Sequence, residues 1–290
     1  MKLLITGCNG QLGRELRREL ERRAPGISTY VDKDELDLTD RKAVETFLMA
    51  GDFSHVINCA AYTAVDRAEE EKMQCAAANV DAVSNIARIA DELGFKVLHF
   101  STDYVFDGNA CRPYSESDKP EPLSVYGVTK RKGETALLGL APESMIIRTG
   151  WLYAPDGHNF VRTILAKGRQ GAPLRVVTDQ TGTPTYAADL AAAVADIVLS
   201  GHWSAGIFNY SNEGVASWYD FAVAILETAG MREAADAVVP VMTSDYPTPA
   251  TRPHYAVLDK SKIKATYGIR IPYWHDALRR CMQRIDLNTL

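Results

Sequence analysis

Long apolar runs are missing from this sequence. No hydrophobic stretch approaches the roughly 20 residues that a membrane-spanning helix needs. The opening residues, MKLLITG, form too short an apolar run for a secretory signal, and no small-residue cleavage site follows them. We therefore expect a cytoplasmic protein that does not act at a membrane.

Cysteine is sparse and scattered, and histidine does not cluster. The five cysteines form no C-x-x-C pair, which argues against a disulfide framework and against a zinc site. The six histidines are dispersed along the chain and give no ligand cluster. We expect buried thiols in a reducing compartment and no metal ion.

The sequence also lacks an excess of positive charge, internal repeats and low-complexity segments. Its 32 Lys and Arg against 37 Asp and Glu give a net charge of −5, which does not favour nucleic acid or an anionic membrane as a partner. The 290 residues suffice for two domains, or for one large α/β domain with an appended lobe.

Glycine is concentrated near the start of the chain. Residues 2–6, with three apolar side chains in a row, predict a short strand, GCNGQLG occupies positions 7–13, and positions 14–23 have the periodicity of an amphipathic helix. Between a strand and a helix, glycines let backbone N–H groups approach a pyrophosphate. The spacing is G-x-x-G-x-x-G rather than G-x-G-x-x-G, and three plain turn glycines are the alternative. The position of the motif favours a dinucleotide site that includes Gly7, Gly10 and Gly13.

A second strand is expected at 27–31 and ends at Asp32. An acidic residue about 20 positions after a glycine loop can hold the adenosine ribose hydroxyls of NAD. The adjacent Lys33 can instead meet the 2′-phosphate of NADP, and a charged surface turn is a third reading. Asp37 and Leu38 follow before the next helix, at a distance that suits the adenine end. The choice between NADH and NADPH therefore stays open.

The third strand, at 54–58, runs into small residues. Such residues let a flat cofactor lie against the backbone. The positions concerned are Cys59, Ala60 and Ala61, followed by Tyr62 and Thr63. A long helix is expected at 73–93, and Asn79 within it either faces solvent or reaches a neighbouring strand end.

A fourth strand, at 97–100, leads into Ser101, Thr102 and Asp103, and a turn-rich loop follows. The carboxyl end of a strand is where parallel sheets carry their ligands. A hydroxyl such as that of Thr102 can hydrogen-bond a reacting oxygen at this position.

The loop ends at a helix that carries Tyr126 and Lys130. If Ser124 caps this helix, the two side chains lie on one face, with roughly 5–6 Å between their Cβ atoms. A free phenol has a pKa of about 10, and a nearby ammonium lowers that pKa. Y-x-x-x-K also occurs as a surface pair, but the hydroxyl upstream and the glycine loop favour proton transfer coupled to hydride transfer.

A fifth strand at 144–148 leads to Trp151 and completes an alternation of strands and helices. Such alternation predicts βαβ units and a parallel sheet. We therefore predict an α/β protein with a doubly wound, Rossmann-type parallel sheet and a smaller C-terminal α/β lobe for the substrate. The residues at predicted strand ends are Gly7, Asp32, Ala60, Thr102 and Trp151.

These motifs resemble the extended short-chain dehydrogenase/reductases, and within them the dTDP-4-dehydrorhamnose reductases. The resemblance covers nearly all of the chain. STDYVFDG at 101–108 and YPTPATRP at 246–253 are specific to this subgroup, whereas the glycine loop and Y-x-x-x-K indicate only the superfamily. The other matching stretches are NCAAYTAVDRAE at 58–69, VYGVTK at 125–130, RTGWLYA at 148–154, NFV at 159–161 and DQTGTPT at 179–185.

The resemblance implies reduction of the C4 keto group of dTDP-4-dehydro-L-rhamnose, a dTDP-linked 4-keto-6-deoxy sugar, by NADPH or NADH. It implies that Tyr126 is the general acid, that Lys130 binds the nicotinamide ribose, and that Thr102 polarises the carbonyl. Implied cofactor contacts are Gly10, Gln11, Leu12, Asp37, Leu38, Ala61, Tyr62, Thr63 and Ser101. Implied substrate contacts are Asp103, Trp151, Asn159 and Arg252, although the ring of Trp151 can instead fill the interface with the lobe.

The predicted domains interleave along the chain. Residues 1–150, roughly 160–177 and roughly 186–210 are assigned to the dinucleotide-binding domain. Roughly 151–159, 178–185 and 211–290 are assigned to the nucleotide-sugar-binding lobe.

Two positions depart from the family pattern. Thr251 stands where the family often carries a basic residue, which leaves Arg252 as the partner of the nucleotide diphosphate. Some members bind magnesium at a dimer interface through glutamates; Glu15 is present here, but Ala188 stands where a later glutamate is expected. We therefore expect no interface metal, and a monomer or weak homodimer.

Two other functions compete with this interpretation. Dehydratases of the same superfamily place Asp-Glu after the catalytic Thr, whereas here Asp103 is followed by Tyr104. A non-catalytic regulatory subunit, similar to the methionine adenosyltransferase beta subunit, has no need for the set of Thr102, Tyr126 and Lys130. Both remain alternatives from sequence alone.

Overall fold

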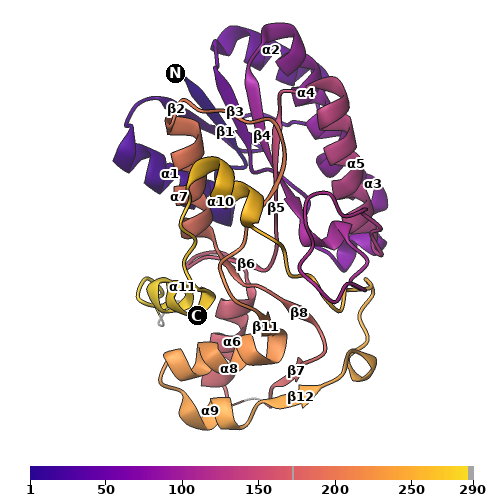
Figure 1. Cartoon of the computed structure of the whole chain (residues 1–290), viewed down its shortest axis with the longest axis vertical. Helices are drawn as coiled ribbons and strands as arrows, with labels where there is room; N and C mark the ends of the chain where they lie inside the picture. Colours follow the sequence, from indigo (N-terminus) through magenta and orange to yellow (C-terminus); the bar gives the residue numbers. More distant parts are fainter. Residues whose placement is uncertain (172, 287–290) are drawn as a thin grey trace.

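A central parallel sheet organises the fold (Figure 1). The protein is represented by a computed structural model that describes residues 1–171 and 173–286. Within these residues six parallel strands form the sheet in the order β10-β5-β4-β3-β1-β2. Their bounds are β1 (Leu3–Thr6), β2 (Ser28–Val31), β3 (His55–Asn58), β4 (Lys96–Thr102), β5 (Met145–Thr149) and β10 (Gly206–Asn209). The predicted doubly wound parallel sheet is confirmed.

The strand order reverses between β1 and β3. The chain leaves β1 toward β2 on one side and returns to β3 on the other, with Thr6 opposite Val31 in one register and opposite Asn58 in the other. In doubly wound sheets, ligands bind in the crevice outside the carboxyl ends of the strands at such a point. The glycine loop after β1 and the small residues after β3 flank this crevice.

Helices cover both faces of the sheet. Apolar residues of α1 (Gln11–Arg23) and α7 (Ala187–Leu199) form one core with it. Those of α2 (Arg41–Gly51), α4 (Ala82–Leu93) and α5 (Val125–Leu140) form the core on the other face. None of the helices in the described part of the chain combines the length and the apolar character that crossing a bilayer requires.

The helix expected at 73–93 is interrupted. It consists of α3 (Lys72–Ala76), a π-helical segment η2 (Ala77–Asp81) and α4. Asn79 lies in the π segment and is fully buried. Its side chain accepts from the Tyr62 N–H and donates to the Tyr62 carbonyl and the Thr129 hydroxyl. Of the two sequence-based alternatives, the structure therefore shows the one in which Asn79 faces inward.

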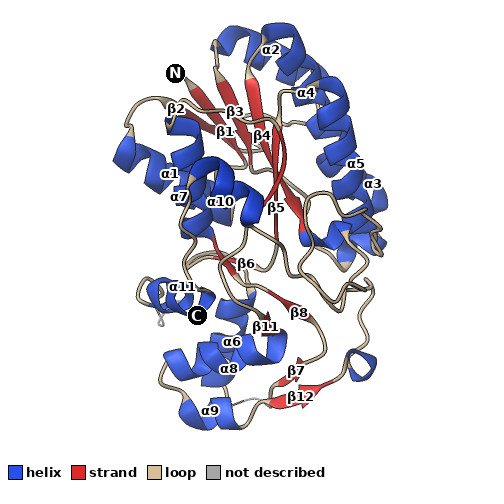
Figure 2. Ribbon diagram, viewed as in Figure 1, coloured by secondary structure: helices blue, strands red, loops and turns tan. Residues whose placement is uncertain are grey.

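The remaining elements build a smaller lobe below the sheet, which Figure 2 shows as helices with short strands. The lobe has its own apolar core, to which α6, α8 and α11 contribute. The elements are β6 (Leu152–Tyr153), α6 (Phe160–Arg169), β7 (Arg175–Val177), β8 (Thr181–Gly182), β9 (Thr185–Tyr186), β11 (Ala216–Ser217), α8 (Trp218–Thr228), α9 (Arg232–Asp236), β12 (Val239–Val241) and α11 (Trp274–Met282). Short 3-10 turns are η1 (Arg67–Glu69), η3 (Asp103–Val105) and η4 (Thr243–Asp245).

Two segments pack differently from the predicted domain division. In 160–177, Ile164 and Val176 belong to the core of the lobe, and β7 pairs with β12 rather than with the main sheet. Near the other end of the chain, Ile263 of α10 (Ser261–Tyr267) packs into the core of the sheet. Such partners lie far away in the sequence, so helix and strand periodicity does not reveal them. We propose that 160–177 belongs to the lobe and 261–271 to the sheet; residues 172 and 287–290 of the predicted ranges lie outside the described residues.

Candidate active site

The predicted catalytic side chains come from two neighbouring elements, β4 and α5. Thr102 ends β4, and Tyr126 and Lys130 lie one turn apart at the start of α5. The expected cap is present, because the Ser124 hydroxyl accepts from the Gly127 N–H at 3.2 Å. Thr102, Tyr126 and Lys130 all line one cavity of about 450 Å³ at the carboxyl ends of the strands.

Tyr126 is the predicted proton donor. Burial raises the pKa of its phenol above the ordinary value, the Asp103 carboxylate raises it further, and a hydrogen bond with Thr102 acts in the opposite direction. The phenol therefore keeps its proton at neutral pH. The sequence led us to expect that Lys130 lowers this pKa, but burial dominates in the structure.

Lys130 is directed into the sheet. Its Nζ donates to the Phe100 carbonyl at 2.6 Å and lies 3.2 Å from Nε2 of His99. The side chain is 2% exposed. Burial lowers the pKa of Lys130 to about 8, against the opposing charges of Glu134 and Cys75. Lys130 therefore titrates near neutral pH.

Asp103 is a buried carboxylate beside the hydroxyls of Thr102 and Tyr126. It is 2% exposed, and Oδ1 accepts from the Thr102 hydroxyl at 2.9 Å. Burial raises the pKa of Asp103 to about 7, despite the lowering effect of this hydrogen bond. A Cβ on Gly150 would lie 2.3 Å from the carboxylate, so glycine is needed there for close packing.

The raised pKa of Asp103 predicts a pH-dependent penalty on stability. The folded protein binds the proton of the Asp103 carboxyl more tightly than the unfolded chain does. The stability that this proton contributes is therefore lost as pH rises from about 4 to about 7. We expect Asp103→Asn to leave stability near wild type at pH 4 and to stabilise the protein at pH 8, by at most about 4 kcal/mol. Urea denaturation at both pH values measures this difference.

Asp118→Asn is the matched control for this prediction. Asp118 pairs with Arg112 and accepts from Ser115, contacts that lower its pKa. We expect this variant to be destabilised at pH 8. A pH-independent difference between Asp103→Asn and wild type would contradict the titration of Asp103.

The glycine loop lies tightly against its surroundings. Gly7 has a φ of +64°, and a Cβ there would lie 2.6 Å from the Ala60 nitrogen. A Cβ on Gly13 would lie 2.3 Å from the Gly7 carbonyl oxygen. The N-cap of α1 is Gly10, which has no side chain to bind the first N–H groups of the helix. These N–H groups suit a pyrophosphate.

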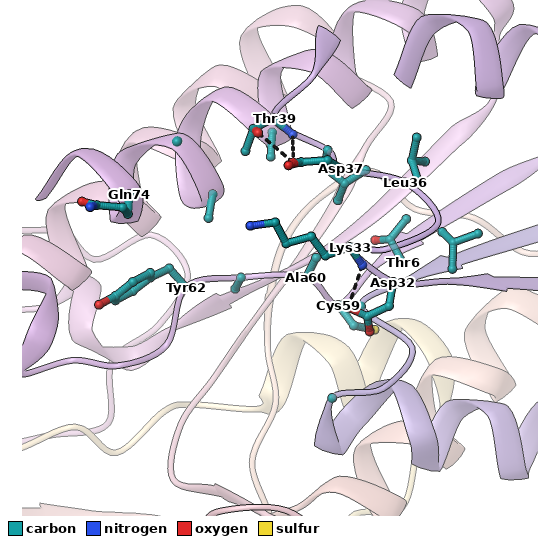
Figure 3. Close-up of a pocket in the computed structure, with 18 residues that line it drawn as sticks. Thr6, Asp32, Lys33, Leu36, Asp37, Thr39, Cys59, Ala60, Tyr62 and Gln74 are labelled. Carbon is teal, nitrogen blue, oxygen red and sulfur yellow. Dashed lines mark hydrogen bonds between the residues drawn. The ribbon is translucent and has the colours of Figure 1, made fainter. Parts of the chain in front are cut away.

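A second cavity, of about 580 Å³, continues from the glycine loop past the ends of β2 and β3 (Figure 3). Asp32 accepts from the Asn9 N–H at 2.8 Å and so supports the loop. Asp37 accepts from the N–H and hydroxyl of Thr39, and these hydrogen bonds lower the pKa of Asp37. Lys33 extends between Asp37 and Ala60.

The two cavities share Gly10, Cys59 and Ala61 and so form one groove. Every residue predicted to contact the cofactor lines it. On the side away from the catalytic residues these are Gly7, Gly10, Asp32, Asp37, Leu38, Ala60, Ala61 and Tyr62. On the catalytic side they are Gly10, Gln11, Leu12, Gly13, Ala61, Thr63, Ser101, Tyr126 and Lys130.

A third cavity, of about 540 Å³, lies between the lobe and the loops below the sheet. Arg252 lines it and binds Asp66 through two hydrogen bonds of 2.7 and 3.0 Å. Lys167 and Arg175 line it as well. Three basic side chains suit a diphosphate, and sequence reasoning identified only Arg252.

A pair of stacked tryptophans separates this cavity from the catalytic one. The rings of Trp151 and Trp218 are 3.5 Å apart and nearly parallel. Trp151 has a φ of +50°, and a Cβ on Gly182 would lie 2.7 Å from its ring. Trp218 lines both cavities, as does Tyr104. Sequence reasoning missed both residues as site residues, because their partners are distant in sequence.

Asn159, predicted to contact the substrate, lines the catalytic cavity but is already held by the protein. It caps α6 and donates to Gln11 at 2.9 Å and to the Ala154 carbonyl at 2.9 Å. The amide therefore ties the lobe to the start of α1.

Glu15 lies on α1 and is 3% exposed. It accepts two hydrogen bonds from Arg284, at 2.8 and 2.9 Å, and also pairs with Arg18. Asp189 on α7 is held by Arg280 in the same way. Across residues 1–171 and 173–286 no group of His, Cys, Asp or Glu side chains is arranged to bind a metal ion.

Comparison with known proteins shows the family of this chain. The model for the RmlD substrate binding domain matches residues 1–287. A dTDP-4-dehydrorhamnose reductase from Aggregatibacter actinomycetemcomitans is 40% identical over 96% of this chain and 97% of its own length. The chain belongs to the dTDP-4-dehydrorhamnose reductase family. This confirms the resemblance found in the motifs.

Solved structures of the family have the same fold. The dTDP-4-dehydrorhamnose reductase of Clostridium acetobutylicum is 40% identical, with a TM-score of 0.92 over 98% of this chain and 99% of its own. The enzyme of Bacillus anthracis, solved in complex with NADP, is 34% identical, with the same TM-score and coverage. UDP-glucose 4-epimerase of Thermus thermophilus, at 21% identity and a TM-score of 0.82 over 98% of each chain, shares the fold alone.

Proposed function

We propose that this member of the family reduces the C4 keto group of dTDP-4-dehydro-L-rhamnose to dTDP-L-rhamnose with NADPH or NADH. The observation that carries the proposal is that Thr102, Tyr126 and Lys130 share a cavity that continues into the glycine-loop groove. A cavity with three basic side chains lies on the other side of the tryptophan pair. Family membership supports the substrate.

The groove fits a dinucleotide on its own geometry. Gly7 and Gly13 let the loop pack directly against the backbone of Ala60 and against itself, and α1 begins at Gly10 beside the cavity. Gly10, Gln11 and Leu12 would hold the pyrophosphate, and Lys130 the ribose next to the nicotinamide. A reduced nicotinamide supplies the hydride when bound.

The chain's own residues supply the proton and the orientation. The Thr102 hydroxyl, which donates to Asp103 in the structure, would turn its hydrogen to the C4 oxygen of a bound substrate. Tyr126, whose raised pKa keeps the phenol protonated, gives its proton to that oxygen as it becomes an alkoxide. Arg252, with Lys167 and Arg175, binds the diphosphate. Trp151 lies where a sugar ring would stack against it.

We also propose a monomer or weak homodimer without an interface metal, because arginines of the C-terminal segment already hold Glu15 and Asp189. A reducing compartment suits the free thiols of Cys8, Cys59, Cys75, Cys111 and Cys281.

One assay distinguishes this function from its rivals. Purified protein is mixed with NADPH or NADH and dTDP-4-dehydrorhamnose, and the absorbance of the reduced cofactor is followed. Stoichiometric loss of absorbance with formation of dTDP-L-rhamnose is expected. Tight cofactor binding without turnover would support a regulatory subunit instead. In a parallel incubation with a dTDP-hexose, water loss without net cofactor oxidation would support a dehydratase.

A further inference from the structure

A buried ion pair lies one turn beyond Lys130 on α5. Glu134 is fully buried and accepts from Nε and Nη2 of Arg148 at 2.8 and 2.7 Å, and Arg148 on β5 is only 1% exposed. Arg131, which is nearer the surface, donates to the same carboxylate at 2.9 Å. Three guanidinium N–H groups therefore converge on the two oxygens of Glu134, a residue that the proposed reduction does not use.

The Glu134 side chain carries its charge inside the protein. Burial acts to raise the pKa of Glu134, but the hydrogen bonds and the charge of Arg148 hold it below its usual value. Arginine keeps its proton in proteins, so the pair is ionic. The core behind the candidate active site therefore contains a fixed carboxylate at neutral pH.

Lys130 has no carboxylate in direct contact. Its Nζ donates to the Phe100 carbonyl at 2.6 Å and lies 3.2 Å from Nε2 of His99, and no Asp or Glu of residues 1–171 and 173–286 forms an ion pair with it. A buried ammonium needs negative charge nearby. Glu134 lies four residues further along the same helix, a spacing that leaves roughly 5–6 Å between Cβ atoms.

We propose that Glu134 is a positioning residue whose carboxylate, fixed by Arg148, keeps Lys130 in the ammonium form at neutral pH. Arg148 approaches the carboxylate from β5, whereas Lys130 shares α5 with it. Of the two charges in the pair, that of Glu134 acts on Lys130 and favours the ammonium.

The other titratable groups around Lys130 carry no charge that could replace Glu134. Burial holds the pKa of His99 on β4 well below its usual value and raises that of the Cys75 thiol on α3, so both are neutral at pH 7. The Tyr126 phenol is protonated, because burial raises its pKa as well. Burial lowers the pKa of Lys130 to about 8, with Glu134 opposing a further fall, so Lys130 is mostly an ammonium at pH 7.

The proposed reduction gives this charge a role, and the inference rests on that function only here. An ammonium offers three N–H groups to the ribose next to the nicotinamide, whereas an amine offers two. When Tyr126 gives its proton to the substrate, a phenolate remains one turn from Lys130, and the ammonium stabilises it. The phenolate, Lys130, Glu134 and Arg148 together then carry no net charge.

The titration of Lys130 can be measured in the full-length protein without cofactor or substrate. The ¹³Cε resonance of Lys130, assigned with Lys130→Met, gives the midpoint, which we expect at about 8 in the wild type. Glu134→Gln keeps the shape of the side chain and removes its charge. We expect the midpoint of Lys130 to fall by about one pH unit or more in this variant.

A double variant separates this effect from damage to the fold. Glu134→Gln leaves Arg148 buried without its partner, which is destabilising. Glu134→Met combined with Arg148→Met removes both charges, and apolar side chains of similar size can replace a buried ion pair without loss of stability. We expect the double variant to unfold near the wild-type temperature, with the midpoint of Lys130 still below the wild-type value.

Glu15→Gln is the matched control. Glu15 is a buried glutamate that accepts two hydrogen bonds from Arg284, but it lies on α1, which covers the opposite face of the sheet from α5. We expect this variant to lose stability as Glu134→Gln does, and to leave the midpoint of Lys130 unchanged.

A stable double variant whose Lys130 titrates as in the wild type would overturn the proposal, because Glu134 would then have only a structural role. An equal fall of the midpoint in Glu15→Gln would overturn it too. If Glu134→Gln does not fold, the double variant alone decides. Because no readout uses the cofactor or the sugar nucleotide, absence of reductase activity would refute the proposed function without touching this inference.

Discussion

Tyr126→Phe is expected to reduce kcat by about 10²–10⁴, the usual range for the loss of a general acid. The variant keeps the ring, its edge-on contact with Tyr104 and the fold of α5, and loses only the hydroxyl. Cofactor affinity should stay near wild type. Stopped-flow absorbance of NADPH under single-turnover conditions measures the chemical step, and fluorescence titration measures the affinity.

Tyr267→Phe is the control for this prediction. Tyr267 is a partly buried tyrosine of α10 whose hydroxyl accepts from the Ser204 N–H. It lines none of the three cavities described above. We expect its kcat to stay near wild type. If Tyr126→Phe also turned over at the wild-type rate, Tyr126 would not be the proton donor.

Gly13→Ala is expected to have the largest effect on cofactor binding. The added Cβ would lie 2.3 Å from the Gly7 oxygen and 2.6 Å from Cys8 Cα. Both atoms belong to the backbone, so the loop itself has to move. Overpacking of this kind costs about 1–3 kcal/mol. Because the displaced loop no longer matches the shape that binds the cofactor, we expect the affinity for NADPH to drop by about 10- to 100-fold.

Gly139→Ala is the matched control, because a Cβ at this position of α5 meets nothing within 4 Å. An alanine there should be neutral or stabilise the helix by up to about 1 kcal/mol. Fluorescence titration with NADPH and thermal denaturation compare the two variants. A Gly13→Ala protein that binds NADPH as tightly as wild type would show that the loop does not need its close contact with α1.

The residues of the proposed cofactor groove were predictable because they follow local patterns. Each lies directly after a strand or in the glycine loop, and the carboxyl ends of parallel strands meet at one edge of the sheet. Periodicity identified the strands that end at Thr6, Asn58 and Thr102. The helical spacing of Tyr126 and Lys130 placed them next to Thr102.

The structure of the lobe was less predictable, because the segments that contact each other within it are far apart in the sequence. Trp218 stacks on Trp151, and β7 pairs with β12. Neither contact can be predicted from the residues that are next to it in the sequence. The same holds for Asn79, whose inward orientation depends on a π-helical segment.

By itself, the sequence determined the parallel sheet and which residues line the groove and the adjoining cavity at its carboxyl edge, because each depends on residues a few positions apart. Only the tertiary structure decided the charge states within the site. Burial raises the pKa values of Tyr126 and Asp103 and lowers that of Lys130. Burial depends on the whole chain packed around these groups, since desolvation is a property of the surroundings and not of the neighbouring sequence.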